Sequence, residues 1–100
     1  MKTKCYKNQL YKVLNAAKEE ESQICLGGES KWDYEQIHSV VIPEMEELLM
    51  HMENGEVFFK YGKQQRLLES SYLITDSLDC LCETKLGKEI LGLQTIYNHL

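Results

Sequence analysis

The sequence predicts an all-α protein, a compact up-and-down four-helix bundle that forms one domain over residues 1–100. Two observations predict this fold class. Four segments place apolar residues three and four positions apart, which gathers them on one face of an α-helix. Short stretches with Gly, Asn or Thr separate these segments, and amphipathic helices joined by short turns bury their apolar faces by packing side by side.

The first helix is expected from about Thr3 to Leu26, with Gly27-Gly28 ending it. Lys and Glu occupy many of the positions between its apolar residues, as in a helix with one face toward solvent. The predicted core positions of this helix are Tyr6, Leu10, Val13, Leu14, Ala17 and Ile24.

The second helix is expected between Ser30 and Asn54-Gly55. Ser30 and Asp33 form a variant of the capping box, and Asn54-Gly55 is a typical left-handed stop. Pro43 has no N–H to donate, and we expect a kink there because the apolar stripe keeps its phase on both sides. That stripe consists of Tyr34, Ile37, Val41, Met45, Leu48 and Met52. An acidic outer surface is expected from Glu44, Glu46, Glu47 and Glu53.

Residues 56–62 are the ambiguous part of the chain, because their Val, Phe and Tyr residues favour a strand. A single strand would have no partner, so we assign them to the first turns of a third helix that runs to about Glu83. Its core face is Leu67, Ser71, Ile74, Leu78 and Leu81. Thr84 can then cap a fourth helix. The apolar seam of that helix is Leu86, Ile90, Leu93, Tyr97 and Leu100.

The composition of the chain disfavours two classes of protein, those that bind nucleic acid and those that span a membrane. Sixteen acidic and eleven basic residues give a net charge of −5, which disfavours nucleic acid as a partner. No apolar run reaches the ~18 residues of a membrane span, and no apolar segment follows the basic N-terminus. We therefore expect a cytoplasmic protein without a membrane association, whose four cysteines are reduced.

Two residue pairs have spacings that metal sites use. Cys80 and Cys82 are paired thiols, but residues two apart on a helix point in nearly opposite directions. Glu35 and His38 match the Glu-x-x-His spacing of carboxylate-bridged di-metal bundles, which require a second such motif that the sequence lacks. We predict no metal and no other cofactor, with Cys82 beside the core, Cys80 on the surface and His38 partly buried. A metal-binding helical bundle remains an alternative.

Two further segments suggest other partners. Gly92–Leu100 resembles the recognition half of a helix-turn-helix, which makes a DNA-binding regulator an alternative, although Lys85 and Lys88 give little basic surface. A second segment interleaves basic and aromatic residues, a combination that can bind single-stranded nucleic acid or an acidic peptide. Its members are Phe58, Phe59, Lys60, Tyr61, Lys63 and Arg66.

No nucleophile motif and no phosphate-binding glycine loop occurs, so the sequence predicts no enzyme. The leading prediction is a non-catalytic protein-interaction module whose partner is an unidentified protein or a second copy in a homodimer. Its surface is expected from apolar residues that lie off the core stripes, because exposed apolar patches mark interfaces. These residues are Trp32, Met50, Phe58, Leu73 and Leu91.

The chain's size, its four helices and the missing signal peptide resemble the bacteriocin immunity proteins. This resemblance is one of architecture and is carried by no motif. It implies an alternative function, a bacterial inhibitor or immunity-type protein that binds a toxin stoichiometrically.

Overall fold

The computed structural model describes residues 2–53, 68–75 and 81–98, and the regular structure in these ranges is entirely helical. The prediction of an all-α protein is therefore confirmed. In chain order the elements are α1 (Lys2–Cys25), α2 (Tyr34–Gln36), the π-helix η1 (Ile37–Val41), α3 (Ile42–Glu53), α4 (Glu69–Thr75), the 3-10 helix η3 (Leu81–Glu83) and α5 (Lys85–Asn98). The predicted assignment of 56–62 and the basic-aromatic segment lie outside the described residues.

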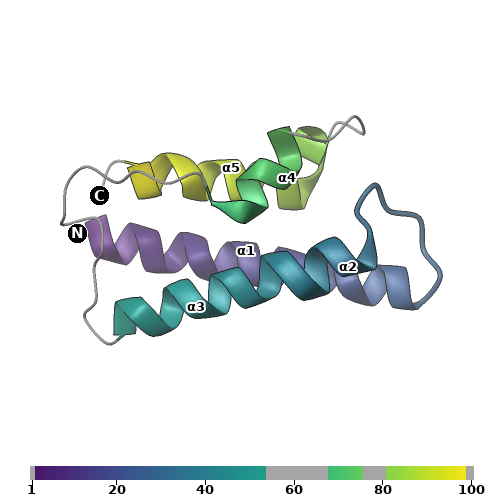
Figure 1. Cartoon of the computed structure of the whole chain (residues 1–100), viewed down its shortest axis with the longest axis horizontal. Helices are drawn as coiled ribbons and strands as arrows, with labels where there is room; N and C mark the ends of the chain where they lie inside the picture. The colour runs from purple at the N-terminus through teal and green to yellow at the C-terminus, as the bar shows by residue number, and fades with distance from the viewer. Residues whose placement is uncertain (1, 54–67, 76–80, 99–100) are drawn as a thin grey trace.

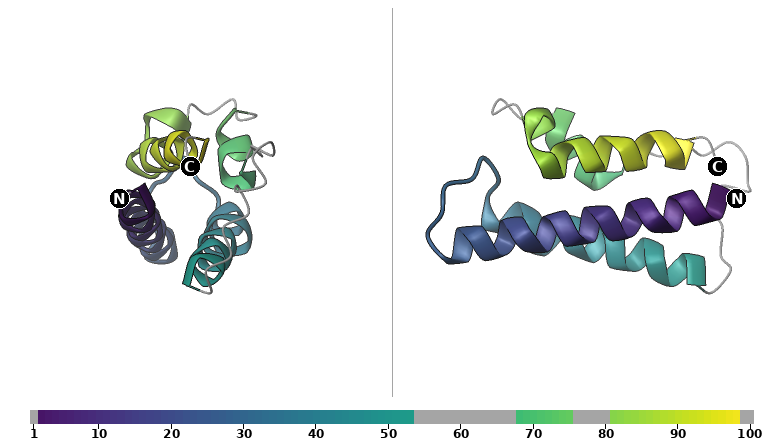
Figure 2. Two further views of the ribbon diagram at one scale, coloured as in Figure 1. Left: turned by 90° about the vertical axis from the view of Figure 1, so that its left-hand side faces the viewer. Right: turned by 180° about the vertical axis from the view of Figure 1, so that it is seen from behind.

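The helices lie along one another. In Figure 1, α1 runs the length of the molecule, while α2, η1 and α3 follow one another back along it in the opposite direction. Helix α5 packs against α1, and the short α4 contacts both η1 and α5. Viewed along the long axis in Figure 2, α1, α3, α4 and α5 surround a common centre.

The centre holds the apolar faces that the sequence predicts for the first and fourth helices. In α1, Ile24 alone among the predicted core residues is only partly buried. The rings of Tyr6 and Tyr97 meet in the core with centroids 6.2 Å apart. The buried residues of these two helices include Tyr6, Leu10, Val13, Leu14, Ala17, Leu86, Ile90, Leu93 and Tyr97.

Helix α1 ends in a Schellman motif. Gly27 adopts a left-handed φ of 85°. The Gly28 N–H donates to the Gln23 carbonyl at 2.8 Å, and the Gly27 N–H donates to the Ile24 carbonyl at 3.0 Å. These two bonds satisfy carbonyls that the helix end leaves free, so the predicted stop at Gly27-Gly28 is confirmed.

The second helical run begins three residues later than predicted. Asp33 is the residue before α2, and its N–H donates to Gln36 Oε1 at 2.9 Å, one half of a capping box. Ser30 instead holds the preceding loop: its hydroxyl accepts from the Trp32 N–H at 3.0 Å and donates to Glu20 at 2.8 Å. The prediction that Ser30 caps this helix is therefore wrong.

The run contains a π-turn directly before Pro43. The Ile42 N–H donates to the carbonyl of Ile37, five residues back, which adds one residue to an ordinary α-turn. Such a turn is one way in which a helix accommodates a break in its hydrogen-bond ladder, and Pro43 makes such a break because it has no N–H. The predicted stripe from Ile37 through Val41 and Met45 to Leu48 is buried, but Tyr34 is exposed, contrary to the prediction.

Thr84 caps α5 as predicted. Its Oγ1 accepts from the Gly87 N–H at 2.9 Å and donates to the Leu81 carbonyl at 2.6 Å. The same oxygen accepts from the indole Nε1–H of Trp32 at 3.0 Å, which joins the loop after α1 to the start of α5.

Candidate functional site

A shallow groove of about 590 Å³ runs between α1 and the η1–α3 junction. Its lining combines polar side chains with the apolar Ile42 and Pro43. We call it the α1–α3 groove, and its full lining is Lys18, Glu21, Ser22, His38, Ile42, Pro43 and Glu46. It lies beside the π-turn, a type of distortion that is frequent at functional sites.

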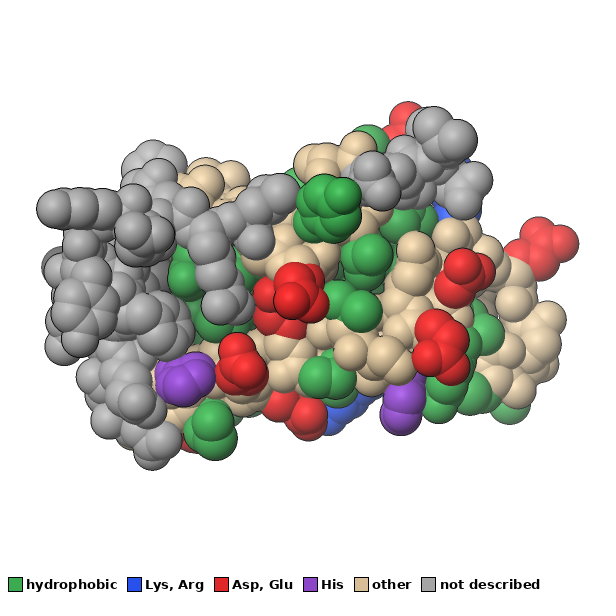
Figure 3. All heavy atoms as spheres, viewed as in Figure 1, with side chains coloured by type: hydrophobic (Ala, Val, Ile, Leu, Met, Phe, Trp, Pro, Cys, Tyr) green, Lys and Arg blue, Asp and Glu red, His purple; other side chains and the backbone are tan. Residues whose placement is uncertain are grey.

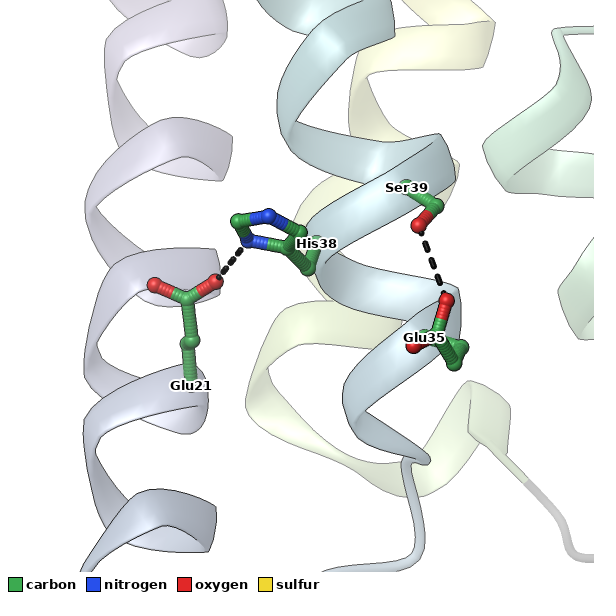
Figure 4. Close-up of polar contacts among 4 residues, drawn as sticks. All are labelled: Glu21, Glu35, His38 and Ser39. Carbon is green, nitrogen blue, oxygen red and sulfur yellow. Dashed lines mark hydrogen bonds and ion pairs between the residues drawn. The ribbon is translucent and has the colours of Figure 1, made fainter.

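His38 and Glu21 join the two walls of this groove. Figure 4 shows His38 of η1 reaching across to Glu21 of α1, with 2.9 Å between His38 Nδ1 and Glu21 Oε2. The His38 side chain is 57% exposed, so the predicted partial burial of His38 is wrong. Exposed ion pairs contribute about 0–1 kcal/mol to stability, so this contact orients the imidazole more than it stabilises the fold.

Tyr34 places an exposed aromatic ring against His38, one of the residues that line the groove. Its ring stacks on the His38 imidazole one helical turn away, with centroids 5.0 Å apart and planes 14° from parallel. The pKa of Tyr34 lies above its usual value because the phenol is partly desolvated and because Glu21, Cys25 and Glu35 place negative charge beside it. The phenol therefore stays neutral, and remains a hydrogen-bond donor, to a higher pH than a free tyrosine.

The predicted metal pairs do not converge. Glu35 accepts a hydrogen bond from Ser39 on its own helix at 3.0 Å, while His38 turns to Glu21 (Figure 4). Cys82 is an exposed free thiol in η3, so its predicted place beside the core is wrong, and Cys80 lies outside the described residues. Within the described ranges, no three His, Cys, Asp or Glu side chains are placed to hold a metal ion.

The residues predicted to form an interaction surface differ in how far the structure buries them. Trp32 is 2% exposed and hydrogen-bonded to Thr84, so it belongs to the core and its predicted place on an exposed patch is wrong. Leu73 and Leu91 are partly buried and packed against the core. Met50 is 51% exposed on α3, and Phe58 lies outside the described residues.

The segment that resembles a DNA-recognition helix is not a separate element. Gly92–Asn98 continues α5 without a turn, and Leu93 and Tyr97 point into the core. The described part of this segment is therefore used for packing.

A second hollow, of about 660 Å³, lies along the outer side of α1. Lys18 and Ser22 line both this hollow and the α1–α3 groove, so the two are continuous across the C-terminal half of α1. Leu26 also lines this hollow and is 88% exposed. Periodicity cannot identify the surface that the two hollows form together, because its residues come from α1, η1, α3 and the turn at Leu26.

Charge on the neighbouring face is mainly negative. Figure 3 shows acidic side chains spread over the face formed by α2 and α3, with hydrophobic side chains among them. Glu44 differs from the other acids of this helix, because it is buried and its carboxylate accepts hydrogen bonds from the start of α4. The prediction that Glu44 belongs to the acidic outer surface is wrong, and no local pattern in the sequence marks it.

Within the described ranges, no helix combines the length and the apolarity needed to cross a lipid bilayer. Comparison of the chain with models of protein families, with curated proteins and with solved structures finds no match in any of the three.

Proposed function

We propose that this protein is a non-catalytic interaction module that uses the α1–α3 groove, and that its partner is a second copy of the same chain. The observation that carries the proposal is the groove itself. It places two apolar side chains, Ile42 and Pro43, close to the exposed Tyr34–His38 stack. An apolar centre with an aromatic anchor and a polar rim is the usual composition of a protein–protein interface.

Two of the charged residues that line the groove are complementary to each other. Lys18 stands on α1 and Glu46 on α3, and neither forms an ion pair with another described residue. In a two-fold dimer a residue i that contacts residue j is matched by j contacting i. Lys18 of each protomer would then meet Glu46 of its partner, which makes two equivalent ion pairs across one interface.

A binding role suits the groove better than catalysis. His38 and Glu21 resemble a general base with an orienting carboxylate, but the imidazole is largely exposed to water. Catalytic electrostatics depend on a site that excludes water, and a shallow groove on the surface does not provide one.

Sedimentation velocity over a range of protein concentrations tests the proposal. We expect a monomer–dimer equilibrium in which Lys18→Glu or Glu46→Lys weakens association about tenfold, because each places like charges opposite one another twice. The double variant Lys18→Glu/Glu46→Lys restores both ion pairs with the two charges exchanged, so it should associate as strongly as the wild type. Lys88→Glu, on the exposed surface of α5, is the matched control. A protein that stays monomeric, or a double variant as weak as the singles, would contradict the proposal.

We further propose that the helices form a single up-and-down four-helix domain and that the second helix bends at Pro43. The opposite directions of α1 and α3 and the π-turn before the proline support this architecture. Residual dipolar couplings on either side of Pro43 would measure the bend.

We also propose a cytoplasmic location. Cys5, Cys25 and Cys82 are exposed free thiols, which suit a reducing compartment. Thiol labelling of the protein in intact cells and after lysis would test their redox state.

A further inference from the structure

The short helix α4 is attached to the rest of the molecule by an unusually polar face. Its seven residues bury Ser70, Ser71 and Ile74, so two of the three buried side chains are serines. Leu68, just before the helix, is also buried. A helical segment as short as Glu69–Thr75 is unstable alone in water, so the described turns of α4 depend on docking.

Docking relies on side chains from two other helices that cap the N-terminus of α4. Glu44 of α3 is 8% exposed, and its two oxygens accept from the N–H groups of Glu69 at 2.8 Å and Ser70 at 2.9 Å. The Ser70 hydroxyl adds a third bond to this carboxylate at 2.7 Å. From α5, Gln94 Oε1 accepts the Leu68 N–H at 2.9 Å.

Side chains of α3 and α5 form the N-terminal cap of α4, a cap that a residue at the start of the helix itself usually forms. The first N–H groups of any helix lack partners within it, and an N-cap residue usually satisfies some of them. In α4 the partners come from positions 25 and 26 residues away in the chain. Undocking therefore breaks the cap and the burial of Leu68 and Ile74 in one step.

We infer that α4 is a detachable strap, which opens as a unit while α1, α3 and α5 remain folded. Local opening is easiest where few apolar side chains are buried, and α4 meets this condition better than the long helices with their continuous apolar stripes. We call Glu44 the latch of this strap, because its carboxylate accepts the three hydrogen bonds from Glu69 and Ser70 that hold α4 in place.

The strap is connected to the α1–α3 groove through η1. Helix α4 packs on η1, and η1 also carries His38, which lines the groove. Opening of α4 therefore removes the contacts that it makes with the π-turn. The inference goes beyond the proposed self-association and does not depend on it.

Native-state hydrogen exchange of the full chain, read by NMR at several low urea concentrations, tests the inference. The amides of Glu69, Ser70 and Tyr72 should exchange by an opening with little urea dependence, since little surface is exposed. The amides of Leu10 and Ile90 should exchange only by global unfolding with a large urea dependence. Equal urea dependence for both groups would overturn the inference, and this comparison needs no variant.

Glu44→Gln tests the latch. Glutamine keeps the volume but turns one acceptor into an N–H donor that faces the backbone donors of α4, so exchange at Glu69 and Ser70 should accelerate about 10–100-fold. Amides in α1 and α5 should change much less. Glu47→Gln, three residues along the same helix, exposed and outside the α1–α3 groove, is the control. Equal acceleration throughout the molecule would show that Glu44 supports the whole fold and that α4 is no separate unit.

Discussion

Replacing Thr84 by valine should destabilise the protein by about 2–3 kcal/mol, although the two side chains have nearly the same shape. Three hydrogen bonds meet at the Thr84 hydroxyl, from the N–H of Gly87, from the indole of Trp32, and to the carbonyl of Leu81. Valine removes all three.

The magnitude follows from two of these bonds. Loss of an N-cap costs about 1 kcal/mol, within a range of roughly 0.5–2. A buried indole N–H without an acceptor adds about 1–3 kcal/mol, and the lower half of that range applies because the bond between the indole and Thr84 is only partly buried. The Leu81 carbonyl still accepts from the Thr84 N–H at 3.1 Å, so loss of its bond to the hydroxyl adds little.

Urea denaturation followed by far-ultraviolet circular dichroism measures this free energy. Trp32 is the single tryptophan of the chain, so its fluorescence reports the same transition from within the core. Thr84→Ser keeps the hydroxyl and should lose less than about 1 kcal/mol. If the valine and serine variants are equally stable, the hydroxyl does not hold this junction.

A double-mutant cycle isolates the long-range bond. Trp32→Phe removes the indole donor, and the coupling between Trp32→Phe and Thr84→Val should be about 1 kcal/mol. Additive effects of the two substitutions would mean that Trp32 is held by packing alone.

Two further predictions use a glycine pair and the phenol of Tyr34. Gly87→Ala should cost more than about 2 kcal/mol in urea denaturation, because a Cβ there collides with the Leu81 carbonyl. Gly27→Ala meets no neighbour and should cost only about 1 kcal/mol for its left-handed φ; equal losses would refute the predicted collision. The raised pKa of Tyr34 means that its contribution to stability is complete below pH 10.0 and is lost as the pH rises through the higher folded-state pKa. The phenolate absorbance of the wild type minus that of Tyr34→Phe should titrate above pH 10.0, and a midpoint at or below that value would contradict it.

The sequence was sufficient to predict features that depend on near neighbours in the chain. The apolar stripes of α1 and α5 follow from helical spacing, and the stop at Gly27-Gly28 and the cap at Thr84 follow from local backbone chemistry. Each of these needs information from only a few adjacent residues.

Features that depend on distant partners could not be predicted in this way. Trp32 lies in a loop, and its burial depends on Thr84, 52 residues away. Glu44 looks like its exposed neighbours until α4 brings Ser70 against it, 26 residues further along. The α1–α3 groove has the same origin, because the side chains that line it belong to separate helices.

The π-turn gives this part of the chain one residue more than an α-helix needs. That residue lies between Ile37 and Ile42. Deleting one residue there would restore an ordinary α-turn and leave the faces of α2 and α3 nearly in phase. A deletion between Met45 and Leu48 has no extra residue to remove, so it would rotate the rest of α3 by about 100° and turn Leu48 out of the core. We therefore expect single-residue deletions to be tolerated between Ile37 and Ile42 far more readily than within α3, where the loss of one residue alters the surface that the rest of the helix presents.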